Sequence, residues 1–218
     1  MSIDLPTQFP NVHARLHRHR RLPGTPEITT TLEIWTNGTR FRIRDGDGRP
    51  ALDLAADVTE PQGFGRVPRT IEEFMDASSA AARPHDLPTD VYGDLVTGLA
   101  SVHEPGQAPW TLPVSEIVPA VEQLFLPLDT GAWRPAGTDT RLDRELQLYE
   151  SEVAGEDDGF AYRSLFRWAV AEPFVLSRHV EDSQNPGLFV TVDVIDLGEG
   201  SVGETDLTAT STLSPRER

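Results

Sequence analysis

The 218-residue chain contains no cysteine and no lysine, so all 19 of its basic residues are arginine. Without cysteine it cannot form a disulfide, bind a metal through thiolate, hold an iron–sulfur cluster or use a cysteine nucleophile. Without lysine it can build neither a P-loop nor a Schiff base. These absences exclude particular chemistries, and they leave the function open.

Positive charge is scarce in general, because 35 acidic residues oppose the 19 arginines and give a formal net charge of −16. Neutralisation of phosphates supplies most of the affinity for nucleic acids, so we expect no nucleic-acid partner. The same charge balance disfavours anionic membrane surfaces.

Long hydrophobic runs are also missing. No stretch reaches 18 apolar residues, so the sequence predicts no transmembrane helix. The opening MSIDLPTQFP lacks the apolar core of a secretory signal. We therefore expect a cytoplasmic protein if Met1 is the natural start, and an exported one if a signal peptide has been removed.

Residues 12–57 alternate between apolar and polar side chains and contain strong turn signals. VHARL, EITTTLEIW, TRFRIR and ALDLA each have the period of two that is typical of strands. Asn37-Gly38 and the run Asp45-Gly46-Asp47-Gly48 separate the later strands. The pattern predicts an antiparallel meander of about four strands.

Residues 59–141 have the spacing of helices. Thr70-Ile71-Glu72-Glu73 matches a capping box and predicts a helix that ends near Ala82, before Pro84. Further helices are predicted from Thr89 to Val102, with Val91, Leu95 and Leu99 on one stripe, and from Ser115 to Phe125. We expect this helical insert to cover one face of the sheet.

Strand patterns return over residues 142–212 and predict two hairpins, with a possible edge strand from Asp206 to Thr212. The order of strands, helices and strands predicts an α+β fold with one curved, mostly antiparallel sheet. We expect a single domain over residues 1–212, followed by a disordered tail, 213–218.

The run VHARLHRHRRL, residues 12–22, carries three histidines. On a strand, His13, His17 and His19 share one face, but His13 and His17 lie about 13 Å apart at roughly 3.3 Å per residue. They cannot bind one ion together, so only His17 and His19 could share a metal, and the neighbouring arginines repel it. We therefore expect no metal and no cofactor.

A second interpretation of this strand face is a docking strip for an acidic protein partner. Its residues would be Arg15, His17, His19, Arg40 and Arg42. The alternative is that these arginines pair with the acidic residues of the chain itself.

Aromatic residues divide between the predicted strands and helices. They either form the core between sheet and helices or line a cavity there, which is a common geometry for an apolar ligand. The ligand-binding candidates are Trp35, Phe41, Trp110, Phe125, Trp168 and Phe174.

No catalytic motif is present: the sequence contains no G-x-S-x-G, no H-E-x-x-H and no glycine-rich phosphate loop. Ser177, His179 and Glu181 are close in sequence, but proximity along a strand does not make a triad. We expect no catalytic residues and no enzyme activity.

Two stretches resemble the outer-membrane lipoprotein carrier (LolA-like) superfamily, which includes lipid-binding lipoproteins of actinobacteria. TLEIWTNGTRFRIRDGDG looks like the family's early strand–turn–strand unit, with Arg40 or Arg42 near the start of the second strand. FRWAVAEPFVLSRHVEDSQNPGLFVTVDVIDLGEG resembles its late hairpin. The resemblance implies an open half-barrel covered by helices.

The same resemblance implies binding of a lipid-like ligand without catalysis. The leading hypothesis is a binding protein that holds an apolar or lipid-like ligand between a curved sheet and helices. The second is an interaction module that docks an acidic partner through the arginine- and histidine-rich strand face.

Overall fold

The computed structural model describes residues 7–21, 27–45, 89–104, 106–122, 124–125, 133–157, 160–182 and 187–209. The first strands are β1 (Phe9–Arg21), β2 (Ile28–Gly38), β3 (Arg40–Asp45), β4 (Thr89–Asp94), β5 (Leu99–His103) and β6 (Trp110–Pro113). A 3-10 turn, η1 (Val114–Glu116), and a short helix, α3 (Val118–Glu122), follow. The later strands are β7 (Arg134–Arg141), β8 (Arg144–Asp157), β9 (Phe160–Ala171), β10 (Phe174–Asp182) and β11 (Phe189–Glu199).

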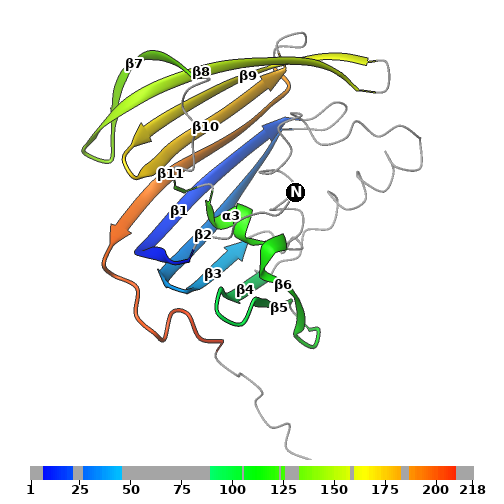
Figure 1. Ribbon diagram of the computed structural model, residues 1–218, viewed down its shortest axis with the longest axis vertical. Helices are drawn as coiled ribbons and strands as arrows, with labels where there is room; N and C mark the ends of the chain where they lie inside the picture. The colour runs from blue at the N-terminus through cyan, green and yellow to red at the C-terminus, as the bar shows by residue number, and fades with distance from the viewer. Residues whose placement is uncertain are drawn as a thin grey trace, which may run out of the picture.

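These strands form one curved antiparallel sheet in the order β6-β5-β4-β3-β2-β1-β11-β10-β9-β8-β7 (Figure 1). Each half of the sheet is a meander in which consecutive strands are neighbours. The halves join in the middle, where β1 pairs with both β2 and β11. The N-terminal and C-terminal strands therefore lie side by side at the centre of the sheet.

Side chains of β1 alternate between two unlike faces. Val12, Ala14 and Leu16 are buried and define what we call the inner face. His13 and Arg15, on the opposite side, define the outer face. β2 follows the same rule, because residues directly opposite each other in an antiparallel pair point to the same side.

A short apolar segment fills the inner face of β1 to β3. α3 and the residues around it contribute side chains that are at most 1% exposed: Ile117, Val118, Ala120, Val121 and Leu124. Beyond α3 the chain is tied to β10, because the Val175 amide donates to the carbonyl of Leu124 at 3.0 Å. A helix of five residues is marginal in water, so apolar burial holds it here.

The expected α+β class, with a helical insert over 59–141, is wrong for the described residues, which are nearly all strand. The predicted helix from Thr89 to Val102 is the hairpin of β4 and β5. Thr89, Val91 and Gly93 are buried in alternation with more exposed neighbours. The four-residue spacing of Val91 and Leu95 reflected a strand followed by a turn, which Gly98 closes with φ of +70°.

The other two predicted helices differ in whether the structure describes them. Among the described residues of 115–125, η1 followed by α3 takes the place of the predicted helix from Ser115 to Phe125. The predicted helix from Thr70 to Ala82 and the predicted strand ALDLA lie outside the described residues. β6 and β7, also within the expected insert, are edge strands of the sheet.

The last strand ends at Glu199, and the expected edge strand beginning at Asp206 is instead a turn in its described part. This segment is held against the start of the sheet by Asn11. The Asn11 amide donates to the Val202 carbonyl at 3.0 Å, and its oxygen accepts from the Val202 amide at 2.9 Å. The single domain over residues 1–212 and the disordered tail, 213–218, stay predictions.

Gly93 allows a close approach between β3 and β4. It lies opposite Phe41, whose ring covers the glycine on the inner face. A Cβ at position 93 would come within 2.1 Å of Cζ of Phe41. Phe41 is itself fully buried and meets the Phe9 ring edge-on at 5.9 Å, so it has little room to move.

We predict that Gly93→Ala lowers the free energy of unfolding by about 1–3 kcal/mol, because the new methyl group overpacks the core. Gly203→Ala is the control, since its Cβ would meet no atom closer than 3.6 Å. Urea denaturation monitored by tryptophan fluorescence measures both. In combination with Phe41→Leu, Gly93→Ala should cost less than it does alone. A Gly93→Ala protein as stable as the wild type would contradict this account of the packing.

Candidate ligand-binding face

One row of side chains crosses the inner face over six strands. Its members are directly opposite one another in successive strand pairs: Thr30, Arg18, Val192, Arg178, Trp168 and Tyr149. Opposite residues of an antiparallel pair share a face. The row therefore places two arginines and a tryptophan on the side of the sheet that carries α3.

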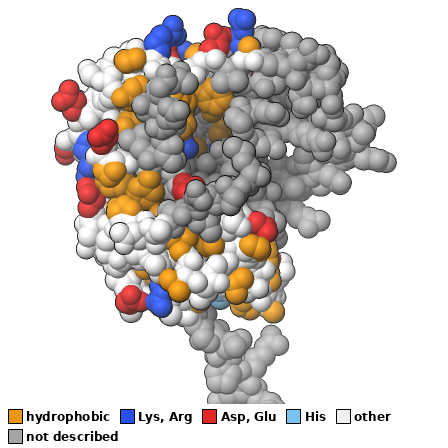
Figure 2. All heavy atoms as spheres, viewed as in Figure 1, with side chains coloured by type: hydrophobic (Ala, Val, Ile, Leu, Met, Phe, Trp, Pro, Cys, Tyr) orange, Lys and Arg blue, Asp and Glu red, His pale blue; other side chains and the backbone are white. Residues whose placement is uncertain are grey.

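The inner face differs between the two halves of the sheet. Under α3 the side chains of Leu16, Ile34 and Ile43 are at most 1% exposed. Further along β9, β10 and β11, five inner side chains are only partly buried: Phe166, Trp168, Val180, Val190 and Val192. Figure 2 shows hydrophobic side chains reaching the surface on the viewed face, with charged groups mainly along its rims. An apolar surface thus continues beyond the part that α3 covers.

Three aromatic residues, Trp133, Phe166 and Trp168, form what we call the aromatic cluster. The ring of Trp133 lies 4.7 Å from that of Trp168 and 6.2 Å from that of Phe166. Trp133 precedes the edge strand β7, whereas the other two come from β9. The cluster offers flat, polarisable surfaces that are not fully enclosed.

Arg178 adjoins the aromatic cluster from β10. Its guanidinium carbon lies 4.2 Å from the centre of the Trp168 ring, which is a cation–π contact. Its Nε is buried and has no hydrogen-bond partner within the described part of the chain. Burial lowers the pKa of Arg178 to about 10, although the negative charge of Glu122 acts in the opposite direction.

Glu122, the last residue of α3, is the acidic group that acts on Arg178. Burial raises the pKa of Glu122 above its usual value, and the positive charge of Arg178 lowers it in part. Near the aromatic cluster, the inner face thus combines apolar surface, the cation of Arg178 and a carboxylate, Glu122, that is costly to ionise.

Several of the expected ligand-binding residues lie in the core. Phe41 and Phe174 are at most 1% exposed. Phe125 is partly buried and packs between Phe9 and Phe174, with ring distances of 6.0 Å and 5.9 Å. Trp110, on the edge strand β6, packs against the core and directs its Nε1 towards Glu104 at 3.4 Å.

The two remaining candidates lie on opposite faces of the sheet. Trp168 belongs to the aromatic cluster on the inner face. Trp35 lies on the outer face, where its ring stacks on His13 at 4.8 Å and Arg42 covers it at 4.7 Å. The structure therefore does not bring the six aromatic candidates together in one place, and their role in ligand binding stays a prediction.

The expected docking strip lies on the outer face, and its arginines have acidic neighbours. Arg15 lies 3.6 Å from Glu33, and Arg42 lies 2.8 Å from Asp90. Arg40 pairs with Glu204 at 2.7 Å and with Asp94 at 3.9 Å. These ion pairs neutralise much of the positive charge that the sequence placed there.

The histidines of the strip contact each other and their neighbours. The rings of His17 and His19 are 6.1 Å apart and nearly perpendicular, and His19 Nδ1 is 3.0 Å from the Thr29 hydroxyl. Within the described ranges, no group of three histidine, aspartate or glutamate residues could hold a metal ion.

Ser177 and His179 also lie on the outer face, but they do not form a nucleophile–base pair. The Ser177 hydroxyl donates to Asp193 at 2.7 Å, and His179 Nδ1 is 2.8 Å from the Thr191 hydroxyl. The serine is therefore engaged by a carboxylate that holds it in place.

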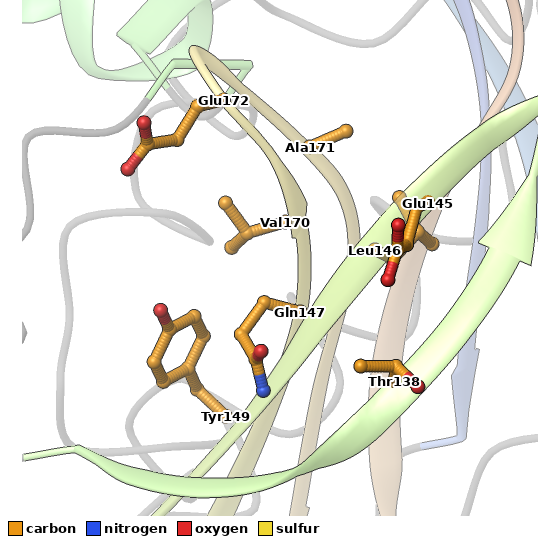
Figure 3. Close-up of a pocket in the computed structure, with 8 residues that line it drawn as sticks. All are labelled: Thr138, Glu145, Leu146, Gln147, Tyr149, Val170, Ala171 and Glu172. Carbon is orange, nitrogen blue, oxygen red and sulfur yellow. The ribbon is translucent and has the colours of Figure 1, made fainter.

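One pocket of about 390 Å³ lies along β7, β8 and the end of β9 (Figure 3). Its lining residues are Thr138, Glu145, Leu146, Gln147, Tyr149, Val170, Ala171 and Glu172. Two carboxylates, an amide and a phenol make it a polar cleft. It is poorly suited to an apolar ligand.

Sequence reasoning missed Arg178 and Glu122 as site residues. The sequence did contain a signal for Arg178: at alternate positions of one strand, it shares a side with the apolar residues Leu176 and Val180. Glu122 gave no such signal, since its position depends on a helix far shorter than the one expected.

Comparison with solved structures finds 28 similar chains, and two of them are described here. A LolA superfamily protein from Nitrosomonas europaea is 13% identical, with coverage of 93% of this chain and 92% of that chain and a TM-score of 0.36. LprF from Mycobacterium bovis is 9% identical, with coverage of 90% and 89% and a TM-score of 0.38. No protein-family model and no curated protein matches the chain. The first of these similar structures bears the name of the superfamily that the sequence resembles, and the resemblance is weak.

The comparisons do not support the cytoplasmic location that we expected from the N-terminus. In the described ranges, no helix has the length and apolar character needed to cross a membrane.

The raised pKa of Glu122 predicts how stability depends on pH. A carboxyl group whose pKa is higher in the folded protein favours folding at low pH, and this contribution is lost as pH rises through the folded pKa. The free energy of unfolding of the wild type, relative to Glu122→Gln, should therefore fall between about pH 4 and pH 7. Denaturant titrations across this range measure the difference.

Glu116→Gln is the control for this experiment, because Glu116 is exposed on η1. Its stability should follow the pH dependence of the wild type. Parallel curves for the wild type and Glu122→Gln would show that Glu122 has no raised pKa.

Proposed function

We propose that the protein binds an apolar or lipid-like ligand against the inner face of β8 to β11 and performs no catalysis. The observation that carries this proposal is the partly exposed apolar surface formed by the aromatic cluster and the valines of β10 and β11. Apolar surface removed from water stabilises a complex by about 25 cal/mol per Å². A ligand that covered this partly exposed apolar face would remove apolar surface from water and so stabilise the complex.

The position of this surface also supports the proposal. It continues directly from the core under α3, so a ligand there would extend the packed interior rather than cover an isolated patch. Its rigid rings and β-branched side chains lose little conformational entropy on binding. Arg178 adds a polar contact at the edge of the cluster, as in many small-molecule sites.

The second candidate function, docking of an acidic partner on the outer face, has less support. Arg15, Arg40 and Arg42 are already within ion-pair distance of acidic residues of this chain. A partner would have to replace these pairs, which reduces the net gain from new ones.

We predict that the full chain binds the uncharged fluorophore N-phenyl-1-naphthylamine, whose emission rises in an apolar site. Trp168→Ala should weaken this binding about tenfold or more, because a tryptophan ring contributes 150–250 Å² of contact surface and tenfold corresponds to about 1.4 kcal/mol. Native mass spectrometry of protein purified without denaturant should also detect a co-purified apolar ligand.

Leu165→Ala is the matched control, because Leu165 lies on the same strand but on the opposite face. It should bind the fluorophore as the wild type does. Absence of fluorophore binding together with an empty protein would overturn the proposed function, and equal losses in both variants would place the ligand elsewhere.

A further inference from the structure

We propose that Arg178 binds the anionic head of an amphiphilic ligand, a carboxylate or a phosphate monoester, whose apolar body rests on the aromatic cluster. This inference rests on the proposed function and assigns the chemical class of its ligand. It is carried by the position of Arg178, by its unused donor and by the contrast with the arginines of the outer face.

Arg178 lies between apolar surfaces on the inner face. Its cross-strand neighbours are Val192 on β11 and Trp168 on β9. A ligand chain on the aromatic cluster and the valines would therefore end within reach of the guanidinium. The site joins an apolar contact area to the cation of Arg178 across three neighbouring strands, β9, β10 and β11.

Arg178 has a buried donor that no acceptor in the described part of the chain uses. Its guanidinium carbon lies 4.2 Å from the centre of the Trp168 ring, and the guanidinium nitrogens donate in the plane of the group. Nε is buried without a hydrogen-bond partner in the described part of the chain. A buried donor without an acceptor is costly, and an oxyanion can accept two parallel hydrogen bonds from a guanidinium.

Arginines on the outer face that stack on aromatic rings provide a comparison for Arg178. Arg42 also stacks on aromatic rings, at 4.7 Å from Trp35 and 5.2 Å from Tyr92, but it is paired with Asp90 at 2.8 Å. Arg178 has the same kind of aromatic contact without a carboxylate at that distance among the described ion pairs. An anionic ligand group would complete the arrangement that Asp90 completes for Arg42.

Two other charged groups affect this site. Arg18 lies in the same row, separated from Arg178 by Val192, and adds positive charge to the inner face. Glu122 acts on Arg178 from α3 and would repel an anion. Removing the charge of Glu122 should therefore strengthen anion binding, whereas removing that of Arg178 should weaken it.

The test compares three probes with the same twelve-carbon chain: dodecanol, dodecanoate and dodecyl phosphate. Each is titrated against the full chain at pH 7, with displacement of N-phenyl-1-naphthylamine as the readout. In the wild type, at least one anion should bind about tenfold or more tightly than the alcohol. The preferred anion distinguishes a carboxylate head from a phosphate head.

Arg178→Met should remove this preference while changing the affinity for dodecanol less than about threefold, because methionine keeps the apolar contact with Trp168. Arg178→Lys should retain part of the preference, and Glu122→Gln should increase it. Arg167→Met is the control, since Arg167 is an exposed arginine on the outer face of β9.

The outcomes separate the two proposals. If none of the three probes displaces the fluorophore, the proposed function fails. If all three bind equally well, or if the preference survives in Arg178→Met, only the role of Arg178 fails. If Arg178→Met does not fold, an unchanged preference in Glu122→Gln and an unchanged preference in Arg178→Lys together overturn it.

Discussion

The pairing of β1 with both β2 and β11 is the constraint on which the rest of the structure depends. It is the one junction between two meanders whose other strands pair only with their neighbours in sequence. β1 contributes Val12, Ala14 and Leu16 to the centre of the core, each at most 1% exposed. Without this junction the described sheet would separate into two halves, neither of which has the full core.

A central strand has to satisfy two environments at once, and the sequence of β1 reflects this. Its outer side chains meet water and acidic neighbours, so histidine and arginine are tolerated there. Its inner side chains are apolar at Val12, Ala14 and Leu16 and change to arginine at Arg18, which is 5% exposed.

Much of the sheet could be predicted from the sequence, because the alternation in β2, β3 and the later hairpins is unambiguous. The hairpin of β4 and β5 could not. Its inner positions include Gly93, Ala100 and Thr89, which are small because Phe41 and α3 fill the space above them. Small residues give no strand signal, and the few larger apolar residues happened to fall four apart.

Other elements could not be predicted from local sequence patterns, for different reasons. β7 is exposed along its whole length, so it has no apolar period to detect. In the turn after it, Leu142 and Asp143 have φ of +50° and +58°. Glycine or asparagine is usual at such positions, so the sequence contains no turn signal here.

The candidate site was only partly predictable for a related reason. Its aromatic residues stood out, but which of them share a face depends on register: Trp35 and Trp168 are both on strands and end on opposite sides of the sheet. Arg178 could be recognised as a site residue only by comparing it with the other arginines of the chain. The protein is acidic, so many carboxylates are present to pair with arginines. On the outer face, nearly every described arginine has a carboxylate within ion-pair distance. An inner arginine whose Nε lacks a partner is therefore an exception to how this sequence uses the residue, and the exception coincides with the partly exposed aromatic surface.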